Sequence, residues 1–198
     1  MGAVVIEMSM SLDGYVAGPD DDPGSLHEWM FGTGAGVPGE GLFGVNLEQM
    51  DDLRSSSGAM IAGRRLYEIT GGWGGSHPFG GVPLFVVSHS VPSDVPHGTT
   101  PLTFVTDGVG SAVDQARHAA GDKNVYVVGG ANIDQQLLRA GLVDELWITV
   151  VPVLMGDGVH LFQETGGTST ALRQRSVTSS QVAHLRYEVL RSEEHRER

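Results

Sequence analysis

Apolar residues recur along the chain in short strand-like runs separated by segments of helical spacing. In the first run, Val4, Ile6 and Met8 alternate with Val5, Glu7 and Ser9, a pattern typical of a strand. Further strands are predicted at 59–62, 83–88, 102–105, 125–128 and 146–151, and helices at 45–54, 64–69, 111–120 and 131–140. Alternating runs at 172–178 and 182–190 predict a terminal hairpin.

This order of elements indicates the class of fold. Strands alternate with helices through the middle of the chain, so we expect an α/β sandwich with a mainly parallel central sheet and an antiparallel edge. Asn46 and Ser111 are candidate helix caps. We expect one domain over residues 1–191, which includes a glycine-rich surface segment at 32–44, followed by a charged tail at 192–198.

Composition then narrows the classes of function. The 198 residues carry a formal net charge of -12, which opposes binding to nucleic acid or to an anionic membrane. The chain has no cysteine, which excludes disulfides and thiolate catalysis, and its histidines form no metal-binding pattern. No apolar run approaches the roughly 20 residues of a membrane span, and the first residues do not predict a signal peptide. We therefore expect a cytoplasmic protein with a small-molecule substrate, no metal, and no nucleic-acid or membrane partner.

Paired glycines between a buried strand and a helix are the most informative local feature. Gly129 and Gly130 follow the apolar run at 125–128 and precede the helix that begins at Ala131. Glycine lets the backbone come close to a ligand, and the first N–H groups of a helix can bind an anion. A tight turn uses the same residues, so both interpretations are open for this motif alone.

Two other strand ends carry side chains suited to phosphate. Gly63 ends one strand, and Arg64 and Arg65 start the next helix, where cations oppose the helix dipole unless an anion is bound. Ser88 and His89 follow another strand, at the end where open α/β sheets bind ligands. For either motif alone, solvated arginines or ordinary turn chemistry are the alternatives.

Asp13 is the candidate carboxylate at the end of the first strand. Asp13-Gly14 is a common turn sequence, but a carboxylate at that strand tip could also bind an amino-pyrimidine or orient a water. The third glycine of a dinucleotide fingerprint is missing after Gly108-Val109-Gly110, which excludes the standard Rossmann motif. No Gly-x-Ser-x-Gly sequence supports a serine hydrolase.

Taken in order, four of these segments resemble the dihydrofolate reductase-like superfamily. The closer match is its branch with the reductase domain of the bifunctional riboflavin-biosynthesis deaminase-reductase. The matching segments are 9–18, 60–68, 125–132 and 144–156, and the resemblance extends from about Val4 to Leu190. It implies the dihydrofolate reductase-like three-layer α/β sandwich.

The resemblance also implies an activity and a set of site residues. The implied protein is an NADPH-dependent reductase that transfers a hydride to a C=N or C=O bond of a small pterin- or pyrimidine-like heterocycle. The implied cofactor-binding residues are Ala17, Gly18, Gly63, Arg64, Arg65, Ser88, His89, Gly129, Gly130, Ala131 and Asn132. Asp13 is the predicted catalytic group, and Trp29 and Pro152 are predicted to line the acceptor side. A homodimer is compatible with the resemblance.

The chain also departs from the family pattern. The zinc signature of the deaminase half needs cysteines, so a stand-alone reductase-like domain is expected. The acidic residue on the first helix of dihydrofolate reductases has no clear counterpart, with Glu48 and Asp51 only near that position. Two alternatives to the reductase are therefore kept, namely a non-catalytic nucleotide-binding module or sensor, and a dihydrofolate reductase proper.

Overall fold

The computed structural model describes residues 1–31, 42, 44–163 and 169–191. The strands of its main sheet are β1 (Val4–Ser11), β3 (Ser57–Gly63), β4 (Leu84–Val87), β5 (Leu102–Val105), β6 (Asn124–Val127), β7 (Glu145–Val151), β9 (Leu172–Ser179) and β10 (Ala183–Val189). The α-helices are α1 (Gly44–Ser56), α2 (Arg64–Ile69), α3 (Val109–Ala120) and α4 (Ala131–Arg139). Shorter elements are the strands β2 (Tyr15–Ala17) and β8 (Val159–His160) and the 3-10 turns η1 (Pro19–Asp21), η2 (Glu28–Met30) and η3 (Gly71–Gly75).

The main sheet has the strand order β5-β4-β3-β6-β1-β7-β10-β9. Neighbouring strands from β5 to β7 pair in parallel, whereas β10 pairs antiparallel with β7 and β9. This arrangement confirms the predicted parallel sheet with an antiparallel hairpin at its edge. β1 lies inside the sheet, between β6 and β7, and is therefore buried along most of its length.

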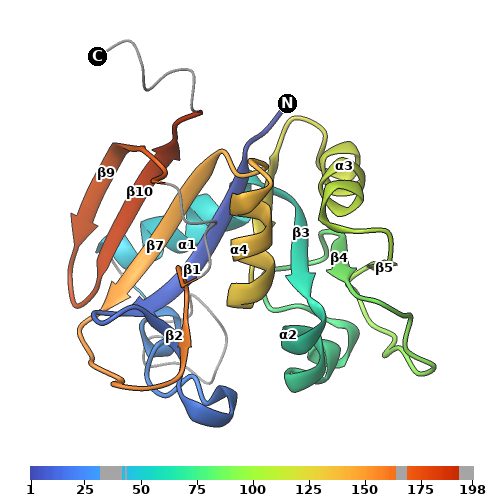
Figure 1. Ribbon diagram of the computed structural model, residues 1–198, viewed down its shortest axis with the longest axis horizontal. Helices are drawn as coiled ribbons and strands as arrows, with labels where there is room; N and C mark the ends of the chain where they lie inside the picture. The colour runs from blue at the N-terminus through green and yellow to red at the C-terminus, as the bar shows by residue number, and fades with distance from the viewer. Residues whose placement is uncertain (32–41, 43, 164–168, 192–198) are drawn as a thin grey trace.

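Helices cover both faces of the sheet, as Figure 1 shows for α4 in front of β1 and α1 behind it. On one face, Ala112 and Val113 of α3 and Leu137 of α4 are fully buried against strand residues such as Ile6. On the other face, Leu53 of α1 packs in a second cluster with strand residues of the same sheet. The three layers predicted from the resemblance are thus confirmed.

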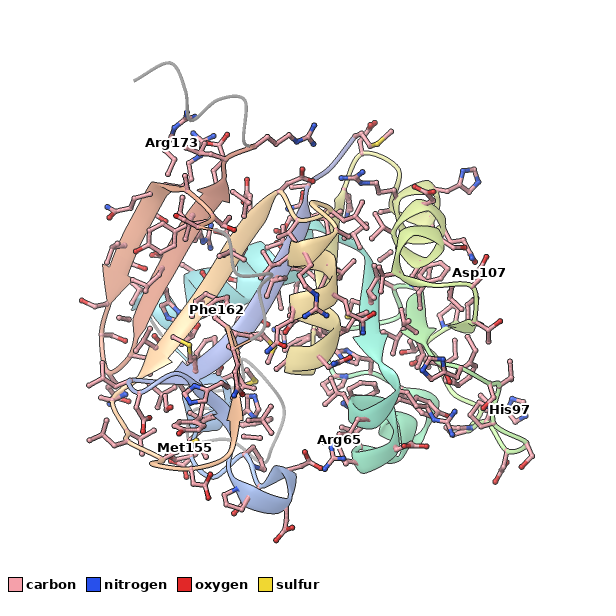
Figure 2. All side chains as sticks on the ribbon, viewed as in Figure 1. Arg65, His97, Asp107, Met155, Phe162 and Arg173 are labelled. Carbon is pink, nitrogen blue, oxygen red and sulfur yellow. The ribbon has the colours of Figure 1, made fainter. Side chains whose placement is uncertain are left out.

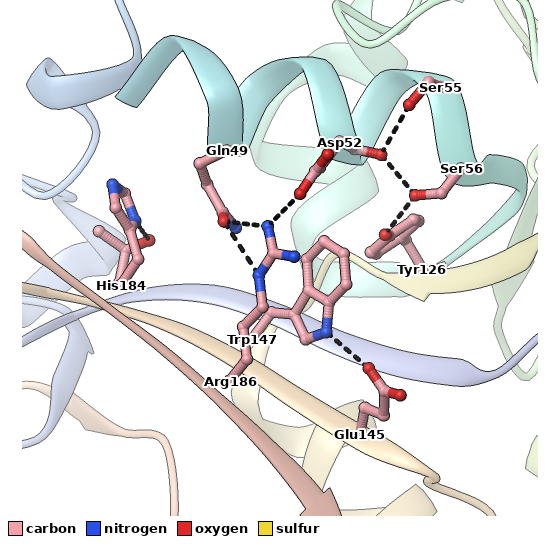
Figure 3. A network of polar contacts seen from close by, with 10 residues as sticks. Gln49, Asp52, Ser55, Ser56, Tyr126, Glu145, Trp147, His184 and Arg186 are labelled. Atoms are coloured by element: carbon pink, nitrogen blue, oxygen red, sulfur yellow. Dashed lines mark hydrogen bonds and ion pairs between the residues drawn. The ribbon is translucent and has the colours of Figure 1, made fainter. Parts of the chain in front are cut away.

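An arginine on β10 fastens α1 to its face of the sheet (Figure 3). The guanidinium carbon of Arg186 lies 3.8 Å from the ring centre of Trp147. The same group donates a 2.6 Å hydrogen bond to Gln49 and forms a 2.8 Å ion pair with Asp52, both on α1. Cation–π contact and hydrogen bonding therefore act together on one side chain.

Two predicted helix caps are wrong. Asn46 lies inside α1, where its Oδ1 accepts a 2.8 Å hydrogen bond from Ser180 Oγ and lies 3.0 Å from His184 Nε2. α3 begins at Val109, before Ser111, with Gly108 at the N-cap position. The tail at 192–198 and most of the segment at 32–44 lie outside the described residues. No helix in the described part of the chain is long and apolar enough to cross a membrane.

The different lengths of β1 and β6 open a space at the middle of the sheet. β6 pairs with β1 only as far as Val127 opposite Ile6, whereas β1 continues along β7 to Ser11 opposite Val151. From Glu7 onward, the edge of β1 that faced β6 has no strand beside it among the described residues. Backbone and side chains on that edge are left to line a cavity.

Candidate active site

A cavity of about 990 Å³ lies at the carboxyl ends of the parallel strands. Its walls include Ser88 after β4, Arg64 after β3, Gly130 after β6 and Glu7 on β1. Three strand-to-strand steps separate β4 from β1, so these groups are spread over roughly 14 Å of sheet. This edge is where open α/β sheets bind ligands, and its width suits an extended one.

Arg64 and Ser88, predicted from separate motifs, meet at one end of this cavity. The Nη1 of Arg64 donates a 2.9 Å hydrogen bond to Ser88 Oγ and a 3.1 Å hydrogen bond to the Ser90 carbonyl. Its Nε donates at 2.6 Å to Glu68, one helical turn further along α2. His89 also lines the cavity. Cationic and hydroxyl groups are thus held together at this end, as phosphate recognition requires.

Arg65 lines the same cavity but forms a different ion pair. Its Nε donates to both carboxylate oxygens of Asp21, at 2.9 and 2.8 Å, and its Nη2 lies 2.6 Å from Oδ2. In Figure 2 the labelled Arg65 extends from α2 toward the blue segment that contains η1. The hydrogen bond and charge of Asp21 raise the pKa of Arg65, so this guanidinium is firmly cationic.

The glycine pair lies between these arginines and β1. Gly129 has φ 102°, in the left-handed region, and a Cβ added there would lie 3.0 Å from Met8 Sδ. Its carbonyl accepts a 2.7 Å hydrogen bond from the N–H of Gly63, which ties the end of β6 to the end of β3. The left-handed φ therefore favours glycine at position 129, and the Met8 thioether would have to shift slightly to admit a Cβ there.

Gly130 has open space on its side-chain position. A Cβ added there would meet no atom within 4 Å, and the residue lines the cavity. Ala131 and Asn132, in the first turn of α4, line it too, and Ile133 donates the first backbone hydrogen bond of the helix to the Gly130 carbonyl. The N–H groups just before Ile133 are available for an anion.

Glu7 provides the cavity with a buried carboxyl group. It is 7% exposed, and burial raises its pKa from 4.5 to about 7, with no hydrogen bond from the described residues to offset this shift. Asp134 of α4 is fully buried, and neither of its carboxylate oxygens has a hydrogen-bond partner among the described residues. Burial, and then the charge of Glu7, raise the pKa of Asp134 well above its usual range. Burial therefore favours the protonated form of Asp134, and at neutral pH both forms of Glu7 are populated.

The cavity wall also carries uncharged polar and aromatic groups. Ser9, two residues along β1, accepts a 2.8 Å hydrogen bond from the indole N–H of Trp29. His77 is buried in the cavity wall, where burial lowers its pKa to about 4, so it is neutral at pH 7. Its ring packs edge-on against Trp73 with centres 4.5 Å apart. These groups can contact a planar, uncharged molecule.

Asp13, predicted as the catalytic group, lies outside the described walls of the cavity. Its carboxylate accepts hydrogen bonds from Ser11 Oγ at 2.6 Å and from the N–H groups of Met155 and Gly156 at 3.1 and 2.8 Å. The Ser11 bond foremost, and these backbone bonds, lower the pKa of Asp13 to about 2. The carboxylate fixes the chain after β7, and this placement does not support a catalytic role.

The structure also separates the other predicted residues. Ala17 lines the cavity, but Gly18 donates its N–H to the Asp22 carbonyl at 2.7 Å within a turn and is not on the wall. Trp29 lies behind Ser9, and Pro152 is exposed and away from the described walls. Neither Trp29 nor Pro152 is therefore on the described wall of the cavity, and their contact with the acceptor stays a prediction.

The sequence pattern did not identify Glu7 as a site residue, because polar and apolar residues alternate along its strand. The polar residues Glu7 and Ser9 alternate with apolar ones, which is typical of a strand with one face in water. In the structure, however, β1 lies between two parallel strands and helices cover both faces of the sheet. A charged residue in a strand that is followed by several βα units is the signal that could have identified it.

Comparison with known proteins identifies the family of this chain. The chain belongs to the RibD C-terminal domain family. The family profile matches residues 3–184, which is most of the chain. Membership in this family supports an oxidoreductase of the reductase-domain type.

Individual relatives are distant but cover nearly the whole chain. The uncharacterized protein YwjB of Bacillus subtilis (strain 168) is 25% identical over 183 residues, which are 92% of this chain and 95% of YwjB. A protein of Shewanella sp. PV-4 whose name refers to riboflavin biosynthesis has a crystal structure with a TM-score of 0.72 and 22% identity, covering 96% of this chain and 99% of that one.

A bifunctional protein gives the same fold. The crystal structure of the Thermotoga maritima diaminohydroxyphosphoribosylaminopyrimidine deaminase and 5-amino-6-(5-phosphoribosylamino)uracil reductase matches with a TM-score of 0.62 and 12% identity. The match covers 96% of this chain but 57% of that protein. The three comparisons agree with the dihydrofolate reductase-like fold predicted from the sequence motifs.

The raised pKa of Glu7 makes stability depend on pH. In the unfolded chain Glu7 ionises near 4.5, and in the folded protein only near 7. Its contribution is fully present below about pH 4.5 and is lost as the pH rises toward 7. We expect wild type to lose about 3 kcal/mol of unfolding free energy over this interval relative to Glu7→Gln. Chemical denaturation at a series of pH values measures the difference.

Glu48→Gln is the matched control, because Glu48 is an exposed carboxylate on α1. Its stability should follow that of wild type at every pH. Parallel curves for wild type and Glu7→Gln would contradict the assignment of a largely protonated Glu7 in the folded protein.

Proposed function

We propose that this protein is an NADPH-dependent reductase that reduces a C=N or C=O bond of a small pyrimidine- or pterin-like heterocycle. The observation that carries the proposal is one continuous cavity with paired arginine and serine groups at one end and a buried carboxyl at the other. Membership in a family of reductase domains supports it.

The phosphates of the cofactor would be held at two places. Arg64 and Ser88, already hydrogen bonded to each other, offer a charged fork and a hydroxyl to the phosphate on the adenosine side. Gly130, Ala131 and Asn132 would present their backbone to the pyrophosphate. The residues fit this role, because Gly130 has no atom within 4 Å of its side-chain position.

The opened edge of β1 would place the reactive ring next to Glu7. When bound, NADPH supplies a hydride at this end. With a pKa near 7, Glu7 can donate a proton to the heteroatom of the reduced double bond and regain one from solvent. Ser9, held by Trp29, offers a fixed hydroxyl to the acceptor. Burial raises the pKa of Glu7 and so favours the protonated form that a proton donor needs.

Removing the arginine that contacts Ser88 tests the cofactor site. We expect Arg64→Ala to weaken NADPH binding by roughly tenfold to hundredfold, because a charged hydrogen-bond partner of phosphate is lost. If Arg64 contacts the 2′-phosphate, NADH binding changes little. Isothermal titration calorimetry with both cofactors measures these affinities.

Arg175→Ala is the matched control for charge, since Arg175 lies on β9 and pairs with Glu188 away from the cavity. It should bind NADPH like wild type. No NADPH binding by the wild-type protein would overturn the proposal. Tight binding without turnover on any acceptor would favour the non-catalytic nucleotide-binding module.

Glu7→Gln tests the proton donor once a screen of pyrimidines, pterins and carbonyl compounds has found an acceptor. We expect turnover to fall by roughly a hundredfold, because glutamine keeps the shape but cannot donate an acid proton. Wild-type turnover should decline as the pH rises through the pKa of Glu7, near 7. In the variant that decline should be absent.

Glu28→Gln is the control within the same cavity, since Glu28 lines it but is exposed. Its turnover should be close to that of wild type. Equal turnover by Glu7→Gln and wild type would exclude Glu7 as the acid while leaving the cofactor site intact.

A further inference from the structure

Asp21 and Arg65 form a clasp across the cavity wall, referred to below as the Asp21–Arg65 clasp. Both residues line the cavity, and three contacts between 2.6 and 2.9 Å join the guanidinium to the carboxylate. The Asp21 side chain is only 15% exposed, although Arg65 is 77% exposed. The carboxylate is thus held in the wall, and the arginine reaches over to it.

The clasp links a loop of unusual conformation to α2. Asp20 and Asp21 have φ values of 60° and 63°, in the left-handed region that non-glycine residues seldom occupy. Other hydrogen bonds made by the described residues of this loop stay inside it, such as Gly18 N–H to Asp22 and Gly24 N–H to Asp22. Pairing with Arg65 therefore ties the loop to the rest of the protein.

A carboxylate and a phosphate use the same donors of an arginine. Both accept paired N–H bonds from one edge of the planar guanidinium, and both gain from its charge. A phosphate can engage Arg65 fully only when Asp21 gives up those donors. Arg64 differs, because its carboxylate partner Glu68 is exposed and lies outside the described walls.

We infer that Asp21 is an internal competitor for the cofactor, occupying on Arg65 the position of one of its phosphate groups and so lowering cofactor affinity. This inference rests on the proposed function, because it assumes that a phosphorylated dinucleotide enters this cavity. Asp21 then acts as a residue that determines cofactor affinity, without any contact with the reacting atoms.

Calorimetric titration of full-length variants with NADPH and NADH tests the inference. We expect Asp21→Asn to bind NADPH roughly fivefold more tightly than wild type, the size of a partly buried ion pair. Asp21→Ser should give the same gain without an amide that could bind Arg65. A gain for both cofactors assigns Arg65 to the pyrophosphate, and a gain for NADPH alone assigns it to the 2′-phosphate.

Asp20→Asn is the matched control. It removes the same charge from the neighbouring residue, which has the same left-handed conformation and no contact with Arg65 among the described residues. Its affinity should differ from that of wild type by less than about twofold, since screened surface charge has a small effect. In the double variant Asp21→Asn with Arg65→Ala, the gain over Arg65→Ala alone should disappear.

Each contrary result has a distinct meaning. An equal gain of NADPH affinity in Asp20→Asn and Asp21→Asn would show that the effect comes from net charge alone. It would overturn the inference that Asp21 competes with the cofactor for Arg65. Weaker binding by Asp21→Asn would show that Asp21 positions Arg65 for the cofactor, which also overturns it. Normal NADPH binding with no change in Asp21→Asn refutes this inference alone, whereas no binding by any variant refutes the proposed function as well.

Discussion

The early end of β6 is the constraint on which the candidate site depends. β6 stops pairing with β1 at Val127, while β1 continues beside β7 to Ser11, so among the described residues the β6-facing edge of β1 has no partner strand from Glu7 to Ser11. The chain turns away at Gly129, whose φ of 102° suits glycine. Glu7 follows directly after the last residue of β1 that pairs with β6. The cavity, the open backbone edge of β1 and the position of the buried Glu7 carboxyl group all result from this difference in strand length.

Different groups line different parts of the cavity: buried groups that favour their neutral forms, and arginines that form ion pairs with carboxylates. Burial raises the pKa of Glu7 on β1 to about 7 and lowers the pKa of His77 elsewhere in the cavity wall to about 4, so burial favours the neutral form of each. At the other end, the guanidinium groups of Arg64 and Arg65 are each paired with a carboxylate. The first environment suits proton transfer to an uncharged ring, and the second suits a phosphate that must compete for its donors.

Local patterns predicted the elements and most of the cofactor side. Arg64 and Ser88 each follow a parallel strand, and the carboxyl ends of such strands meet at one edge of a sheet, so their proximity could be predicted. The role of Glu7 in the site could not be predicted, because its burial depends on the position of β1 between β6 and β7. The Asp21–Arg65 clasp joins residues far apart in sequence, with no local signal. Asp13 lies at the predicted strand end, but its carboxylate accepts hydrogen bonds from the backbone N–H groups of Met155 and Gly156.

The most direct test of the central claim is a backbone amide NMR titration of the isotope-labelled protein with NADPH. The account predicts that the largest shifts follow the carboxyl edge of the sheet, from Ser88 through Gly63 and Gly130 to Met8 on the open edge of β1. Amides of the β9–β10 hairpin should stay unchanged. Shifts concentrated on that hairpin, or none at saturating NADPH, would contradict the claim that the early end of β6 creates a dinucleotide site.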